Sequence, residues 1–416
     1  MANTKYRQNP QKQNIDVLFA DAMKLQRQGD LSSAYEKFAE ILSHDPHHGD
    51  ALALSGIIQC QNGKLDEGIR FLEQAVAVSP QHFDARLNLT MAYESVERLE
   101  EATDSCRRLI ELKPDFLDAY RQLASLLDRQ GKTEAAEQSM REALLTSPKD
   151  AELFYALIQR QVKNNHLAGA LETCERFFQS YPNNMRALAF MPFVLNEQGD
   201  ETAARNLLDF DRFVHCFTAD QVPGYESPDA LNTDLIDFIL SHPSLAFEPD
   251  SKSTRFGSQT ASLQSETAKP MDALRRMIEK NVGNYRSDLT GQADHPYLAA
   301  IPSSLSLDIW ATALPPSGHQ KPHFHPGGWV SGVYYPALPE SMLNDTTTTS
   351  GHIEFGRPQE QYGFNAHPLL RTIRPEVGLM ILFPSYFYHR TIPVVEVSKE
   401  TAAQRFSIAF DAIPLS

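Results

Sequence analysis

Two histidines that lie two residues apart, His323 and His325, form the segment of this sequence with the clearest metal-binding chemistry. Successive side chains of an extended backbone point to opposite faces, so both imidazoles would leave one face and Phe324 the other. Two neutral imidazoles on one side suit a divalent ion of iron, copper, zinc or nickel. A third ligand would have to come from elsewhere in the chain, and His389, shortly after the apolar run 378–384, is the candidate. The pattern predicts a metal site in the C-terminal half.

Short apolar runs separated by turn residues must position these side chains. From Leu305 onward they occupy residues 305–314, 329–338, 351–355, 370–373, 379–383 and 405–413. Several short strands at such spacing predict an all-β sandwich or jelly roll, whose open mouth commonly holds a small-molecule site. Residues 231–240 and a segment opened by Pro270 read as helices that brace the sheet. The polar stretch 248–268 reads as a long loop that is either mobile or functional.

Three blocks of the sequence, 322–335, 378–389 and 405–411, resemble a little-studied family of 2-oxoglutarate/Fe(II) oxygenases that are often fused to tetratricopeptide repeats. The similarity covers roughly residues 228–416, and the combination of the three blocks is more specific than any one of them. The resemblance implies a double-stranded β-helix with Fe(II) as the metal and 2-oxoglutarate as the cosubstrate. It implies no catalytic residue beyond the metal site.

The same resemblance implies roles for individual residues. Arg405 would pair with the distal carboxylate of 2-oxoglutarate, because a guanidinium fork matches a carboxylate. Ser407, on the same strand face, would add a hydrogen bond, and Tyr334 or Tyr335 would add another. Since the two tyrosines alternate along one strand, they face opposite sides, and the sequence leaves open which of them faces the site. Asp411, on the strand of Arg405, is the alternative structural partner for the guanidinium.

One position departs from the usual pattern of the superfamily. Its metal triad is two histidines and a carboxylate, yet His325 stands where the Asp or Glu is expected. Three arrangements follow: His325 is a ligand in a three-histidine site; water fills its place beside His323 and His389; or Glu354 supplies a carboxylate from a neighbouring strand.

The N-terminal half is repetitive. Prolines recur every 34 residues, at Pro46, Pro80, Pro114, Pro148 and Pro182. This period is typical of tetratricopeptide repeats, each a pair of helices. We expect five repeats and a degenerate sixth over 15–208, a junction over 209–227 and the oxygenase-like domain over 228–416. The predicted fold class is therefore α + β multidomain, with an all-α solenoid before a jelly roll.

Charge and composition exclude several classes of function. The formal net charge is -15, which argues against nucleic acid or an anionic membrane as the main partner. The sequence holds 4 cysteines without a close pair, as expected in a reducing compartment. No run approaches the length of a membrane span, and the polar N-terminus lacks the apolar run of a signal peptide. We expect a cytoplasmic protein.

Three functions fit these observations. The first is a 2-oxoglutarate-dependent Fe(II) dioxygenase (a hydroxylase), acting on a protein or peptide held in the groove of the repeats. The second is a non-catalytic tetratricopeptide scaffold with a degenerate jelly roll, for which the missing carboxylate argues. The third is a cupin-like three-histidine dioxygenase without a cosubstrate, for which Arg405 would be superfluous.

Overall fold

The computed structural model describes residues 10–181, 185–218, 222–250, 252–291, 294–315, 317–344, 347–393 and 404–415. The chain divides into two compact units, Met1–Leu153 and Phe154–Ser416. The division falls in the fifth pair of helices, whereas the sequence suggests a boundary at 208/209, which remains a prediction.

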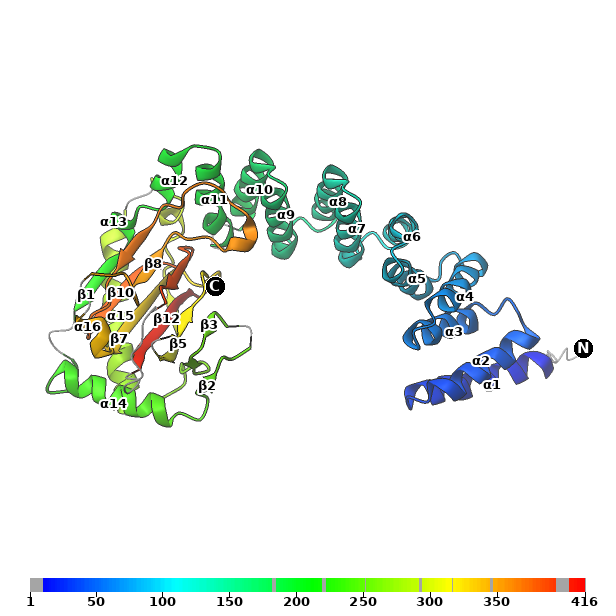
Figure 1. Cartoon of the computed structure of the whole chain (residues 1–416), viewed down its shortest axis with the longest axis horizontal. Helices are drawn as coiled ribbons and strands as arrows, with labels where there is room; N and C mark the ends of the chain where they lie inside the picture. The colour runs from blue at the N-terminus through cyan, green and yellow to red at the C-terminus, as the bar shows by residue number, and fades with distance from the viewer. Residues whose placement is uncertain are drawn as a thin grey trace, which may run out of the picture. The chain divides into compact units, whose positions relative to one another are not determined.

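Paired helices make up the first unit, as the 34-residue period predicts. They are α1 (Pro10–Arg27), α2 (Leu31–His44), α3 (Gly49–Gln61), α4 (Leu65–Val78), α5 (Phe83–Ser95), α6 (Leu99–Leu112), α7 (Leu117–Arg129) and α8 (Thr133–Thr146). Figure 1 shows them as successive pairs. The tetratricopeptide prediction is confirmed for this region.

The turn inside each pair needs a residue in the left-handed region. Gly63 occupies it with φ 77°, at no steric cost for a residue without a Cβ. The third and fifth pairs place Glu97 (φ 59°) and Asn165 (φ 56°) there, so the turn geometry persists without glycine.

The second unit begins within the fifth helix pair, includes one further pair, α11 and α12, and continues into the β-domain. Its helices are α9 (Ala151–Lys163, which crosses the division), α10 (Leu167–Ser180), α11 (Arg186–Glu197), α12 (Glu201–Leu207), α13 (Phe210–Phe213), α14 (Pro228–Ser241), α15 (Lys269–Leu289) and α16 (Glu340–Asn344), with short 3-10 turns at Leu298–Ala300 and Glu360–Tyr362. The two helices expected from the sequence beyond residue 228 correspond to α14 and α15.

Antiparallel strands form the rest of the second unit. They are β1 (His215–Thr218), β2 (Ala246–Phe247), β3 (Thr254–Arg255), β4 (Ser258–Gln259), β5 (Leu305–Leu314), β6 (His319–Gln320), β7 (Val330–Ala337), β8 (Ile353–Phe355), β9 (Arg371–Ile373), β10 (Leu379–Pro384), β11 (His389–Thr391) and β12 (Arg405–Pro414). The large sheet has the order β1-β10-β7-β12-β5-β4-β2, and two smaller ones have the orders β11-β8-β9 and β3-β6. In Figure 1, β10, β7, β12 and β5 run side by side. The predicted jelly roll is confirmed.

The long polar loop contributes to both kinds of sheet. Strand β4 pairs with β5, and β3 pairs with β6 through Thr254↔Gln320 and Arg255↔His319. This loop therefore supplies one edge of the region around the histidines, although its sequence shows no strand period.

Helix α11 packs against the segment that carries the histidine pair. The Phe190 ring lies 6.5 Å from that of Phe324 and 6.3 Å from that of Tyr388, the neighbours of the histidines. At the end of the helix, the Glu197 carboxylate accepts hydrogen bonds of 2.8 Å from the backbone N–H groups of Asn365 and Ala366. The last repeat thus packs against the β-domain on the side of Phe324 and Tyr388.

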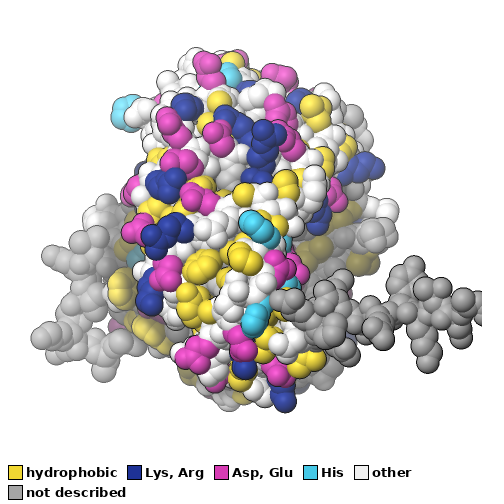
Figure 2. All heavy atoms as spheres, turned by 90° about the vertical axis from the view of Figure 1, so that its right-hand side faces the viewer, with side chains coloured by type: hydrophobic (Ala, Val, Ile, Leu, Met, Phe, Trp, Pro, Cys, Tyr) yellow, Lys and Arg dark blue, Asp and Glu magenta, His cyan; other side chains and the backbone are white. Residues whose placement is uncertain are grey.

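Among the helices that the structure describes, none is long and apolar enough to cross a membrane. On the face drawn in Figure 2, basic, acidic and hydrophobic side chains are intermingled.

Candidate metal and cosubstrate site

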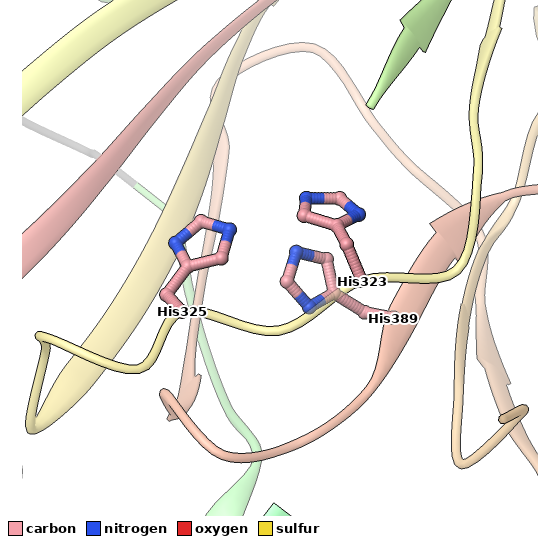
Figure 3. A group of neighbouring side chains, drawn as sticks. All are labelled: His323, His325 and His389. Atoms are coloured by element: carbon pink, nitrogen blue, oxygen red, sulfur yellow. The ribbon is translucent and has the colours of Figure 1, made fainter. Parts of the chain in front are cut away.

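Three imidazoles converge at the edge of the three-stranded β11-β8-β9 sheet. One potential ligand atom from each of His323, His325 and His389 lies within 4.8 Å of the others, and Figure 3 shows the rings gathered together. Backbone hydrogen bonds fix this arrangement, because His323 and His389 exchange N–H···O bonds of 3.1 and 2.9 Å, and the N–H of His325 donates to the carbonyl of Ser385 at 2.9 Å. The fold thus brings His389 beside His323 and His325.

Each imidazole has an acceptor at Nδ1. The acceptors are the carbonyls of Lys321 (2.8 Å) and Phe387 (3.0 Å), for His323 and His389 respectively, and the Asp411 carboxylate (2.6 Å) for His325. An Nδ1–H that donates to such a group leaves the lone pair on Nε2, the tautomer a metal ligand requires.

The protonation states also suit a metal. Burial, together with the neighbouring His325, lowers the pKa of His323 to about 3. Burial and the adjacent imidazoles likewise lower the pKa of His389 well below its ordinary value. Both rings are therefore neutral at pH 7, with lone pairs available for coordination.

Asp411 is a partner that the sequence did not identify for this site. Its carboxylate accepts from His325 and, at 2.6 Å, from the hydroxyl of Ser331, which lies 2.8 Å from the hydroxyl of Ser385. The sequence indicates Asp411 only as a partner for Arg405, because strand alternation places both on one face of β12. No local pattern indicates its hydrogen bond to His325.

Glu354 does not join the histidines. Its buried carboxylate accepts hydrogen bonds of 2.5 Å from Arg357 and 2.6 Å from Arg390. Burial alone would raise the pKa of Glu354, but the two guanidinium partners outweigh it and lower that pKa overall. The structure gives no support to Glu354 as a metal ligand.

Arg405 lies in the same narrow cavity as the histidines. The residue is only 5% exposed; its guanidinium donates to the Gly351 carbonyl at 2.8 Å and to the Thr391 hydroxyl at 3.3 Å. The Nε atom of Arg405 has no hydrogen-bond partner. The guanidinium forms no ion pair with any carboxylate of the described residues. A buried guanidinium without a counter-anion is costly, so this position calls for an anionic ligand.

Two further predicted residues line this cavity and one does not. The ring of Tyr335 lies 5.2 Å from the Arg405 guanidinium, and its buried hydroxyl has no partner. Ser407 is buried beside them, with its hydroxyl 2.6 Å from that of Thr312. Tyr334 faces away, because its hydroxyl donates to Asn232 of α14 at 2.7 Å. Of the two tyrosines left open by the sequence, Tyr335 lines this cavity and Tyr334 does not.

Comparison with known proteins supports this reading of the fold. Residues 308–411 match the family described as "Putative 2OG-Fe(II) oxygenase", and residues 61–127 and 117–150 match tetratricopeptide repeat families. The chain joins tetratricopeptide repeats to a 2OG-Fe(II) oxygenase-family domain. This family implies Fe(II) and 2-oxoglutarate, and the histidine cluster can hold a metal.

Curated relatives resemble only part of the chain. The human protein O-mannosyl-transferase TMTC1 is 30% identical over 163 residues, which are 38% of this chain and 18% of that protein. Cellulose synthase 1 operon protein C of Komagataeibacter xylinus is 26% identical over 37% of this chain and 12% of its own length. The chain therefore spans less than a fifth of either relative.

Solved structures give a likeness of low score. A crystal structure of MamA protein, 18% identical, matches 40% of this chain and 91% of that chain with a TM-score of 0.36. A structure of Naa15/Naa10 bound to HypK-THB, 19% identical, matches 48% of this chain and 31% of that one with a TM-score of 0.40.

The residues of the oxygenase-family domain fit the groups that the family implies. Imidazoles that donate from Nδ1 present Nε2 as a ligand atom for Fe(II), and in His323 this atom lies 3.3 Å from the Ser253 hydroxyl. The unpaired Nε of Arg405 and hydroxyl of Tyr335 are donors for a carboxylate. The donors for the metal and for the anion line one cavity.

Proposed function

We propose that the C-terminal domain is a 2-oxoglutarate-dependent Fe(II) dioxygenase that hydroxylates a protein or peptide recruited by the repeats. The observation that carries this proposal is the pairing, in one cavity, of three convergent imidazoles with a buried arginine that lacks a carboxylate partner among the described residues.

The metal ligands in this proposal are the Nε2 atoms of His323, His325 and His389. Asp411 fixes the ring of His325 by accepting from Nδ1, and such partners orient the ligand and raise its basicity. The fixed Nδ1–H groups of the other two rings hold them in the same tautomer.

The cosubstrate-binding residues are Arg405, Tyr335 and Ser407. The guanidinium of Arg405 would take the distal carboxylate of 2-oxoglutarate, with the hydroxyls of Tyr335 and Ser407 as further donors. Because Arg405 is already held by the Gly351 carbonyl and the Thr391 hydroxyl, little side-chain freedom is lost when the anion binds.

The bound iron and 2-oxoglutarate supply the oxidising chemistry with O₂, and the protein supplies ligation, orientation and a dry surrounding. Aromatic side chains form part of the cavity wall: the ring of Phe383 lies 4.7 Å from that of His389, and that of Trp310 lies 5.3 Å from that of His325. No side chain of the cavity is needed as a general base.

The repeats supply the link to a polypeptide substrate. Tetratricopeptide arrays are solenoids with a concave surface, of a kind that typically binds proteins. Helix α11 of the last repeat packs on Phe324, the residue between His323 and His325 in the sequence, so this repeat contacts the segment that carries the two histidines.

The test is formation of succinate from 2-oxoglutarate by the full chain under O₂, with and without Fe(II). We expect slow iron-dependent succinate formation without a prime substrate in the wild type and none in His389→Ala. A protein that binds the metal but neither binds nor consumes 2-oxoglutarate would contradict the proposal. This result would favour a three-histidine dioxygenase without a cosubstrate.

A further inference from the structure

A wider cleft of about 870 Å³ opens beside the metal cavity. It shares four lining residues with that cavity, so whatever lies in the cleft lies next to His323. They are Gln320, His323, Arg390 and Thr391. Its other walls come from the long polar loop and from residues 357–368. This is the place where a prime substrate would reach the site.

Positive charge dominates this cleft. Lys252, Arg255 and Lys321 line it, and none of them forms an ion pair with a carboxylate of the described residues. Glu360 is the one acidic side chain among the described residues that line it. A basic cleft on a chain of net charge -15 is a local reversal of sign, and such a cleft attracts and orients anionic ligands.

Two other cations of the cleft do not add to this excess. Arg357 and Arg390 both donate to the buried Glu354 carboxylate, which partly neutralises them. The unpaired positive charge is therefore concentrated on the loop side of the cleft, at Lys252, Arg255 and Lys321.

An exposed aromatic residue, Phe256, lies within this loop, in the turn between β3 and β4. Phe256 is 56% exposed and has a φ of 52°, a conformation that costs energy for a residue with a Cβ. Its ring lies 6.0 Å from that of His319, which lines the cleft. The exposed ring therefore offers an apolar surface next to the cleft.

We propose that this cleft binds an acidic polypeptide segment, so that the substrate side chain is flanked by Asp or Glu residues. We favour an acidic polypeptide over a nucleic acid because the cleft has few cations. Nucleic-acid binders commonly neutralise on the order of six to ten phosphates, whereas this cleft offers three cations without an ion-pair partner among the described residues. The inference that the bound segment is a substrate rests on the proposed oxygenase function, but the binding itself does not.

The probe is a fluorescein-labelled peptide of alternating glutamate and serine, compared with a lysine–serine peptide of equal length. Fluorescence anisotropy with the full chain should show binding of the acidic peptide, weakened by added salt, and much weaker binding of the basic one. Lys252→Gln/Lys321→Gln should weaken acidic-peptide binding about tenfold, because each exposed pair contributes modestly. Arg255 is left intact, since its guanidinium donates to the carbonyls of Lys252 and Thr254.

The matched control is Arg276→Gln/Lys280→Gln, which removes the same charge from exposed positions on α15. The control should bind the acidic peptide as the wild type does. Equal binding of both peptides, an equal loss in the control, or tighter binding of single-stranded oligothymidine would overturn the proposal.

The same preparations are titrated with Fe(II) and 2-oxoglutarate, which separates the two proposals. A protein that binds 2-oxoglutarate but not the acidic peptide keeps its oxygenase assignment and loses this one. A protein that binds the acidic peptide but not 2-oxoglutarate keeps the anionic-segment site and loses the oxygenase assignment.

Discussion

Replacing Arg405 by alanine is expected to weaken the binding of 2-oxoglutarate by about a hundredfold. The guanidinium is 5% exposed and spends two hydrogen bonds on Gly351 and Thr391, while its Nε has no partner. Two charge-assisted hydrogen bonds to a carboxylate at about 1.5 kcal/mol each give about 3 kcal/mol, or about two powers of ten in affinity. Lysine at this position should recover only part of the loss, because a point charge cannot reproduce the planar fork.

The assay is isothermal titration of 2-oxoglutarate into the Mn(II)-loaded full chain, so that no turnover takes place. Arg371→Ala is the matched control, because this arginine lies on β9 with a side chain that is 52% exposed. Since Arg405 is buried, thermal unfolding of each variant by circular dichroism accompanies the titration, and metal stoichiometry is measured in the same samples. Unchanged metal binding with wild-type affinity for 2-oxoglutarate in Arg405→Ala would refute the reasoning.

Two further predictions concern the metal site and two the stability of the fold. His389→Ala should abolish metal binding, because His389 contributes to every arrangement of the site, and metal analysis of the purified variant checks this. Asp411→Asn should lower metal affinity about tenfold to a hundredfold by releasing the ring of His325, as a competition titration with a chelator would show, while an unchanged affinity would make the contact incidental. Glu354 has a lowered pKa, so its carboxylate stabilises the fold above its unfolded pKa of about 4.3 and that stability is lost as the pH falls through the folded value; Glu354→Gln should flatten this acid dependence of the unfolding free energy, and an identical pH profile would contradict it. Phe190→Ala should lower the unfolding free energy by about 3 to 5 kcal/mol, because the fully buried Phe190 ring would leave a cavity in its aromatic cluster; a loss below 1 kcal/mol in denaturant titration would show that α11 does not support the β-domain.

Much of the architecture was predictable because it depends on periodic signals. The recurring prolines predict the helix pairs, and strand β5 occupies the same residues, 305–314, as its apolar run. Glu97 occupies the turn position where most other pairs have glycine, and its φ of 59° shows that the position in the repeat, rather than the residue type, sets the conformation.

The parts that could not be predicted depend on contacts between distant segments. The Asp411–His325 hydrogen bond joins residues 86 positions apart, and no local pattern indicates it. Choosing between Tyr334 and Tyr335 requires knowing which face of β7 packs against α14. The turn before this strand sets that face. The contact between α11 and Phe324 could not be predicted either, because the sequence indicates a domain boundary between the last repeat and the β-domain.

The central claim is that one cavity holds a metal on three histidines and 2-oxoglutarate on Arg405. The most direct measurement is an anaerobic titration of the full chain with Fe(II) and then 2-oxoglutarate, observed by absorption spectroscopy. The account predicts a metal-to-ligand charge-transfer band in the wild type that requires both additions, that is absent in His389→Ala and that needs about a hundredfold more 2-oxoglutarate in Arg405→Ala. A wild-type protein that binds Fe(II) but develops no such band at saturating 2-oxoglutarate would contradict it.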